Sequence, residues 1–226
     1  MREIVFDTET TGLDPRAGHR LVEIGCVEMV NGLPTGNTFH TWLNPQRDMP
    51  DEAFQIHGLS AEFLEDKPLF ADIAERFMAF VGDARLVIHN AQFDMGFINA
   101  ELDRLGLPAL KNEVIDTITL ARRRFPGQRV SLDALCERMG VDNAHRTKHG
   151  ALLDAELLAD VYIELTGGRQ RGFDLISATA EVQVTFVSTT IEVRPPRPHT
   201  PSDAELAAHI AFLSKLKSPI WLRAAA

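Results

Sequence analysis

Two carboxylates lie two residues apart near the N-terminus, in the segment Asp7-Thr8-Glu9-Thr10-Thr11-Gly12. The apolar run just before them predicts a buried strand. Because side chains alternate along a strand, Asp7 and Glu9 point to the same side. Paired carboxylates at the end of an apolar strand repel each other unless a cation joins them, and their oxygens suit Mg²⁺ or Mn²⁺. The pair alone is more typical of a solvated strand end, so a metal site needs further ligands.

Two more acids follow at the starts of predicted helices. Asp94 ends the segment His89-Asn90-Ala91-Gln92-Phe93-Asp94, and Asp154 ends the segment His149-Gly150-Ala151-Leu152-Leu153-Asp154. An acid in a first helical turn can simply favour the helix dipole. His149 alone could be an exposed loop histidine, but histidine titrates near neutral pH and can therefore serve as a general base.

Together these segments supply four carboxylates and one histidine, each at the end of a predicted element. Two divalent cations about 3.5–4 Å apart need such a cluster to split a phosphodiester in line. One cation would generate and orient hydroxide, and the other would stabilise the leaving 3′ oxygen. His149 would accept the proton of the attacking water. The combination predicts metal-dependent phosphodiester hydrolysis.

The composition fits a globular enzyme. The 226 residues are 45% hydrophobic and 24% charged, which predicts a packed core. The net charge of −9 argues against broad electrostatic binding to nucleic acid, but not against an enzyme that meets phosphates through metal ions. Cys26 and Cys136 lie among apolar residues, as expected of buried reduced thiols. We see no signal peptide and no apolar run of ~20 residues, and expect a cytoplasmic protein away from the membrane.

Apolar periodicity predicts an α/β domain that ends near Gly168. The first three strands should be antiparallel, with Gly32–Gly36 as the connection between the second and third. Ser60 and Ser131 are expected to cap helices. The predicted strands span 3–8, 20–30, 38–43, 85–89 and 114–117, and the predicted helices span 60–64, 71–80, 92–105, 131–139 and 151–165.

The three motifs, in their order, resemble those of the DEDDh family of 3′→5′ exonucleases. The resemblance is closest to the epsilon subunits, the proofreading subunits of bacterial DNA polymerase III. It covers residues 1 to about 170 and extends to Glu23-Ile24-Gly25, to Pro50–Phe54 with His57-Gly58, and to Ser131–Cys136. It implies a ribonuclease-H-like fold, in which a five-stranded mixed sheet is flanked by helices.

The resemblance also implies roles for individual residues. Asp7, Glu9, Asp94 and Asp154 would bind two divalent cations, Mg²⁺ or Mn²⁺, and His149 would be the catalytic histidine. The residues expected to contact the terminal nucleotide are Asp7, Glu9, Thr10, Gly12, Leu13, Glu52, His57 and Asp154. A basic stretch could contact the incoming single strand of DNA or be a solvated face; it comprises Arg122–Arg124, Arg129, Arg146 and Lys148.

The composition changes after Gly168. We predict a linker over 169–201, rich in proline towards its end, and a C-terminal segment over 202–226. Ser202 and Glu205 have the spacing of a capping box, which predicts a helix over Leu206–Lys215.

Two short motifs in this tail point to protein partners. The first, Gln170, Phe173 and Leu175, resembles the clamp-binding motif of bacterial replication proteins, although a plain linker fits as well. The second is the segment Leu206–Leu222, which ends in Ile220-Trp221-Leu222 and resembles the C-terminal peptide by which epsilon subunits hold the polymerase alpha subunit. A Trp beside Leu and Ile after a proline-rich tether is typical of an interface anchor. Alternatively, Trp221 folds back on its own domain. The sequence leaves open whether a small third core subunit also binds this chain.

The expected function is therefore the proofreading exonuclease of DNA polymerase III, releasing nucleoside 5′-monophosphates from the single-stranded 3′ end of DNA. A stand-alone repair or RNA-trimming exonuclease would share the chemistry but not the tail. A polymerase-binding subunit with an inactive site is the alternative from another class, and the intact set of five residues argues against it.

Overall fold

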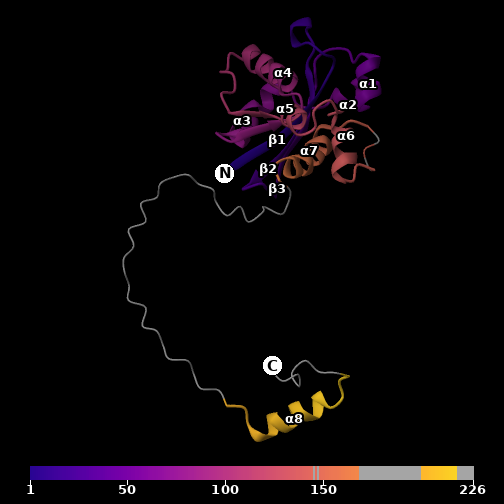
Figure 1. Cartoon of the computed structure of the whole chain (residues 1–226). Helices are drawn as coiled ribbons and strands as arrows, with labels where there is room; N and C mark the ends of the chain where they lie inside the picture. Colours follow the sequence, from indigo (N-terminus) through magenta and orange to yellow (C-terminus); the bar gives the residue numbers. More distant parts are fainter. Residues whose placement is uncertain (145, 147, 168–199, 218–226) are drawn as a thin grey trace. The chain divides into compact units, whose positions relative to one another are not determined.

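The computed structural model describes residues 1–144, 146, 148–167 and 200–217 (Figure 1). The chain divides into two units, Met1–Leu175 and Ile176–Ala226, and each is described by itself. In the described ranges, no helix is long and apolar enough to cross a bilayer. The clamp-like motif at 170–175 and the apolar peptide at 220–222 lie outside the described residues.

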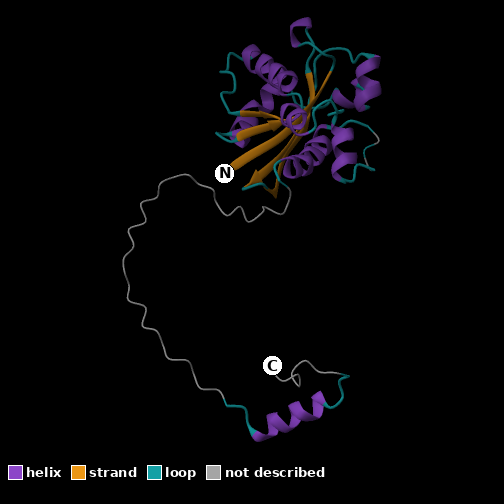
Figure 2. Cartoon of the chain, viewed as in Figure 1, coloured by secondary structure: helices purple, strands orange, loops and turns teal. Residues whose placement is uncertain are grey.

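A five-stranded mixed sheet forms the centre of the first unit (Figure 2). Its strand order is β3-β2-β1-β4-β5. The first three strands pair antiparallel, whereas β4 pairs parallel with both β1 and β5. This arrangement confirms the predicted fold class. The strands are β1 (Arg2–Thr10), β2 (Leu21–Val30), β3 (Leu33–Trp42), β4 (Arg85–Ile88) and β5 (Val114–Asp116).

The turn between β2 and β3 is shorter than predicted. Only Asn31 and Gly32 connect the strands, with φ of 54° and 79°. Positive φ at both positions makes the two-residue turn that matches strand twist, for which Asn-Gly is the preferred pair. The prediction that Gly32–Gly36 forms the connection was therefore wrong. Pro34 instead pairs with Met29, which β3 tolerates because it is an edge strand.

Helices cover both faces of the sheet and create two cores. Alternation along β1 divides its side chains: Ile4 and Phe6 join the core with α3 and α4, while Val5 joins the core with α5, α6 and α7. The helices are α1 (Asp51–His57), α2 (Ala61–Leu64), α3 (Phe70–Val81), α4 (Ala91–Arg104), α5 (Thr117–Arg124), α6 (Leu132–Met139) and α7 (Ala151–Leu165), with a 3₁₀ turn η1 (Pro15–Ala17).

The predicted helix starts agree with the structure. Ser60 and Ser131 accept hydrogen bonds from the backbones of Phe63 and Ala134. In the second unit, helix α8 (Asp203–Leu213) begins with the predicted capping box, since Glu205 accepts from the backbone of Ser202 at 2.8 Å and Ser202 accepts in return. Both cysteines, Cys26 and Cys136, are buried and free, as expected.

Candidate active site

Strand β1 presents Asp7 and Glu9 on the face of the sheet that α7 covers, because they continue the alternation of Val5. Glu9 is buried and Asp7 is partly exposed. In the antiparallel register, Asp7 lies opposite Gly25 of β2 and Glu9 lies opposite Glu23. Glu23 is thus a third acid beside the two carboxylates at the end of β1.

Gly25 sets the distance between this strand pair and α7. A Cβ built on Gly25 would lie 2.2 Å from the carbonyl carbon of Ala151 and from the backbone nitrogen of Leu152. Only glycine allows the first turn of α7 to approach the sheet so closely. Asp154 lies in that first turn and is buried, so the close approach brings it to Asp7 and Glu9.

Asp94 reaches the site from the opposite layer. It lies in the first turn of α4, where it is 2% exposed. Thr8, which points to the α4 side of β1, donates a hydrogen bond of 2.7 Å from its hydroxyl to Oδ1 of Asp94. Thr8 therefore fixes the orientation of an acid 86 residues away in the sequence. The sequence motif contained Thr8, but its spacing carried no sign of this contact.

The acids disfavour one another's ionisation. Burial, and then the charges of Asp154, Glu23 and Asp94, raise the pKa of Glu9 to about 8. Burial also raises the pKa of Asp94 to about 7, against the opposing hydrogen bond from Thr8. For Asp7, burial and the neighbouring acids raise the pKa well above its ordinary value. Such a cluster keeps its charges near neutral pH only when cations balance them.

The donor set fits a hard divalent cation. Ligand atoms of Glu9, His149 and Asp154 lie within 4.8 Å of one another, close enough to bind one ion together. Asp7 and Asp94 interact electrostatically with Glu9 at the same strand end. Carboxylate oxygens are the ligands expected for Mg²⁺ or Mn²⁺, the cluster supplies four such side chains, and no thiol is among them.

Arg146 lies within this cluster. Its Nε and Nη2 donate to the two carboxylate oxygens of Asp154, each at 2.6 Å. Nη2 also lies 2.7 Å from Nδ1 of His149, and Nη1 donates to Asp133 at 2.6 Å. Burial alone would raise the pKa of Asp154, but the hydrogen bonds from His149 and Arg146 lower it overall. His149 itself is half exposed.

The other residues of the basic stretch differ from Arg146 in their surroundings. The Arg124 guanidinium donates to the carbonyls of Glu164 at 2.7 Å and Leu165 at 2.8 Å, and so satisfies free carbonyls at the end of α7. Arg122 and Arg123 are exposed. The stretch therefore divides into a structural arginine, exposed arginines and Arg146 in the acidic cluster.

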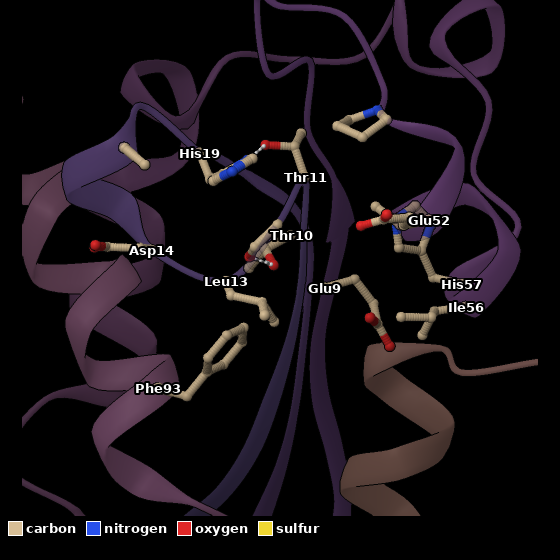
Figure 3. Close-up of a pocket in the computed structure, with 14 residues that line it drawn as sticks. Glu9, Thr10, Thr11, Leu13, Asp14, His19, Glu52, Ile56, His57 and Phe93 are labelled. Carbon is tan, nitrogen blue, oxygen red and sulfur yellow. Dashed lines mark hydrogen bonds between the residues drawn. The ribbon is translucent and has the colours of Figure 1, made fainter.

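A pocket of about 440 Å³ opens beside Glu9 (Figure 3). Leu13 and Phe93 lie together on one side, and Glu52, Ile56 and His57 face them from the other. Six of the eight residues expected to contact the nucleotide line it; the other two, Asp7 and Asp154, belong to the acidic cluster. The lining residues are Glu9, Thr10, Thr11, Gly12, Leu13, Asp14, Ala17, His19, Pro50, Glu52, Ala53, Ile56, His57 and Phe93.

His57 offers a hydrogen-bond donor in this pocket. Its Nδ1 accepts from the backbone N–H of Leu59 at 3.0 Å, so the neutral ring carries its proton on Nε2. Burial lowers the pKa of His57 and favours that neutral form. Nε2 is buried and makes no hydrogen bond of regular geometry among the described residues, although the backbone of Thr10 lies close enough to act on the pKa of His57. A ligand in the pocket would supply a partner for Nε2.

Buried contacts hold the pocket wall in place. Thr10 donates to the carbonyl of Gly12 at 2.6 Å, and Thr11 exchanges backbone and side-chain hydrogen bonds with Arg20. Arg20 in turn forms a bidentate ion pair with the buried Glu101 of α4, at 2.6 and 2.8 Å. A Cβ on Gly12 would overlap the ring of His19. The wall is therefore tied to both β2 and α4.

Comparison with known proteins identifies the family. A family model described as Exonuclease matches residues 4–162. DNA polymerase III subunit epsilon of Rickettsia felis is 50% identical over 228 residues, which cover 96% of this chain and 97% of the relative. The chain belongs to the epsilon-subunit family of exonucleases. The epsilon subunit of Escherichia coli K12 is 45% identical over 94% of this chain and 92% of its own length.

Solved structures agree with the fold of the epsilon family. Exonuclease X, solved in complex with 5′-overhanging duplex DNA, is 30% identical with a TM-score of 0.58, over 73% of this chain and 90% of its own. The nuclease domain of 3′hExo, a DEDDh family member solved with rAMP, is 17% identical with a TM-score of 0.64, over 73% of this chain and 91% of its own. The second likeness shows the fold alone.

The structure brings the predicted acids of the epsilon motifs and His149 to one place. Sequence reasoning assigned no part to Thr8, His19 or Phe93, and it placed Arg146 on a DNA-binding or solvated face. Only Arg146 had a signal in the sequence, since it lies three residues before His149.

Proposed function

We propose that this chain is the 3′→5′ proofreading exonuclease of a bacterial replicative DNA polymerase. It hydrolyses the 3′-terminal phosphodiester of single-stranded or mispaired DNA ends and releases nucleoside 5′-monophosphates. The observation that carries the proposal is that Asp7, Glu9, Asp94, Asp154 and His149 converge beside a pocket large enough for one nucleotide. Such a pocket, with apolar walls and a few polar groups, suits a small ligand such as one nucleotide.

In this proposal Asp7, Glu9, Asp94 and Asp154 hold two divalent cations, Mg²⁺ or Mn²⁺. When bound, these cations supply a hydroxide at neutral pH and balance the charge on the phosphate and the leaving oxygen. His149 is half exposed, where solvent can reach it, and accepts the proton of the attacking water.

The pocket orients the terminal nucleotide for this step. Leu13, Ile56 and Phe93 offer apolar contacts for a base or sugar, and Leu13 is 83% exposed at its edge. The Nε2–H of His57 donates to the nucleotide, and Glu52 accepts from the nucleotide. Thr10 and Gly12 contribute backbone surface. Holding the nucleotide in this way aligns the terminal phosphate with the acidic cluster.

We also propose that the tail attaches the exonuclease to its polymerase. The alignment with the Rickettsia felis relative extends over 96% of this chain, beyond the 73% shared with exonuclease X. Helix α8 exposes Leu206, Ile210 and Phe212, an apolar surface typical of a docking segment. The peptide Ile220-Trp221-Leu222 would bind the alpha subunit, and Gln170, Phe173 and Leu175 the sliding clamp. A bacterial cytoplasmic location and a small third core subunit belong to the same proposal.

The nuclease assignment is tested with a primer that carries a mispaired 3′ end. The full-length chain with Mg²⁺ or Mn²⁺ should release mononucleotides, and Asp7→Ala should release almost none. Equal release by the two proteins would refute the assignment of the site.

A second experiment separates the proofreading subunit from a stand-alone exonuclease. The full-length chain should co-purify with a polymerase alpha subunit, whereas a version that ends at Gly168 should cut DNA but not co-purify. Equal recovery of the polymerase with both versions would favour a different docking surface and reject the role of the tail.

A further inference from the structure

Arg146 forms its bidentate ion pair with an acid that the proposed function assigns to the metals. We propose that Arg146 is a resident counter-ion of the site: it occupies Asp154 in the metal-free protein and must withdraw when a divalent cation binds. This inference rests on the proposed function, because it requires Asp154 to be a metal ligand. It makes Arg146 a positioning residue that competes with the metal rather than one that contacts substrate.

The two hydrogen bonds between Arg146 and Asp154 support this competition between the guanidinium and a metal ion. Both oxygens of Asp154 accept from Arg146 at 2.6 Å, which is the strong parallel arrangement of a guanidinium and a carboxylate. The side chains of Arg146 and Asp154 are only 8% and 4% exposed. A buried, ionised acid of this kind is costly without a positive partner, and Arg146, beside His149, supplies a permanent charge when no metal is bound.

The guanidinium and a cation would use the same ligand atoms. Glu9, His149 and Asp154 offer ligand atoms within 4.8 Å of one another, and Arg146 contacts two of these three residues. A divalent cation held by the carboxylates of Glu9 and Asp154, beside His149, would bring its positive charge against the guanidinium. Two positive charges in direct contact with the same buried carboxylate repel each other strongly. The arginine-paired state and the metal-bound state of Asp154 therefore exclude each other.

Asp133 gives Arg146 a second partner outside the cluster. It accepts from Nη1 at 2.6 Å, and its side chain is 61% exposed on α6. Arg146 can therefore leave Asp154 and remain paired in the solvent-exposed position. Because Arg146 also contacts Nδ1 of His149, its withdrawal changes the surroundings of the proposed base as the metal enters.

The test measures Mn²⁺ binding to the full-length chain without DNA, by calorimetry or by the EPR signal of free Mn²⁺. We expect Arg146→Gln to bind Mn²⁺ several-fold more tightly than the wild type, and to melt at a lower temperature in chelator. Arg146→Lys keeps the charge but loses the paired hydrogen bonds to Asp154, so it should also bind Mn²⁺ more tightly than the wild type, by a smaller factor. If Arg146→Gln does not fold, the lysine variant alone decides.

Two further variants serve as controls for the Mn²⁺ measurement. Arg138→Gln removes a guanidinium that contacts Phe125 and the carbonyl of Arg129, away from the acids, and should bind Mn²⁺ as the wild type does. Asp154→Asn should weaken binding. Unchanged or weaker binding in the Arg146 variants, with Asp154→Asn still defective, would overturn this inference alone. Wild-type binding by Asp154→Asn would instead overturn the metal site and, with it, both proposals.

Discussion

The backbone of Ala151, at the start of α7, lies against Gly25 of β2 with no room for a side chain between them. This contact determines where Asp154 stands relative to Asp7, which lies opposite Gly25 in the sheet. A residue without any functional group thus controls the spacing of the proposed metal ligands.

Replacing Gly25 with alanine should therefore remove activity. The added Cβ would push the first turn of α7 away from the sheet, and a displacement of about 1 Å at a catalytic group can cost on the order of 100-fold in rate. Nucleotide release from a mispaired primer measures the loss. The matched control is Gly96→Ala in α4, where a Cβ meets no atom within 4 Å; it should keep full activity and gain up to about 1 kcal/mol in stability. Wild-type activity in Gly25→Ala would contradict the prediction.

The stability of the metal-free protein should fall as the pH rises. Burial raises the pKa of Glu9 to about 8 in the folded state, so the stability that its proton contributes is fully present below about pH 4.5 and is lost as the pH rises to about 8. Between pH 6.5 and 8.5 in chelator, the wild type should lose on the order of 2 kcal/mol relative to Glu9→Gln. Denaturant unfolding at both pH values measures this difference.

Saturating Mn²⁺ provides the control for that experiment. With the carboxylates ionised and bound to a cation, the pH-dependent loss in the wild type should shrink. A constant stability difference between wild type and Glu9→Gln at the two pH values would show that Glu9 is already ionised at pH 6.5, against the expectation.

Thr8 should affect metal binding because it orients the carboxylate of Asp94. Thr8→Val keeps the shape of the side chain but removes the hydroxyl that donates to Asp94 at 2.7 Å. Residues that orient metal ligands typically contribute about 10- to 100-fold to metal affinity, so the variant should require correspondingly more Mn²⁺ for half-maximal activity. Thr8→Ser retains the donor and should stay much closer to the wild type. Identical metal requirements for valine and serine would reject the role of the hydroxyl.

Helix α8 should bind the polymerase through one face. Leu206 and Ile210 are one helical turn apart and exposed, so Ile210→Asp would place a charge within the apolar surface. We expect co-purification with the alpha subunit to be lost while nuclease activity remains. Ala204→Asp adds the same charge in the first turn of α8, away from Leu206, Ile210 and Phe212, and should still co-purify. Loss of the polymerase in both variants would point to a general effect of charge.

The sequence predicted the elements that carry strong apolar periodicity. Strand β1 and helix α7 were recognised because their buried residues form nearly continuous apolar runs. Helix α1 was not predicted, because it has seven residues and buries only Ala53 and His57. Helix α5 was missed for a similar reason: Thr117 and Ala121 are its buried residues, and three arginines end it.

The candidate site was predictable in its acids but not in its contacts. Asp94 and Asp154 follow recognisable patterns at helix starts, whereas their partners depend on the tertiary fold. Thr8 meets Asp94 only because β1 lies beside the start of α4. Arg146 meets Asp154 only through the path of the chain before α7, for which no periodic pattern exists. Polar pairs of this kind have no local sequence signal.

The helix that packs on Gly25 comes late in the sequence, so the acidic cluster is completed late during synthesis. The ribosome releases Asp7, Glu9 and Asp94 well before α7, which carries Asp154 and completes the second core. A growing chain therefore holds three of the four acids without the element that brings in the last. On this basis, nuclease activity should arise only when synthesis of the N-terminal unit is nearly finished, and an incomplete chain cannot degrade nucleic acid around it.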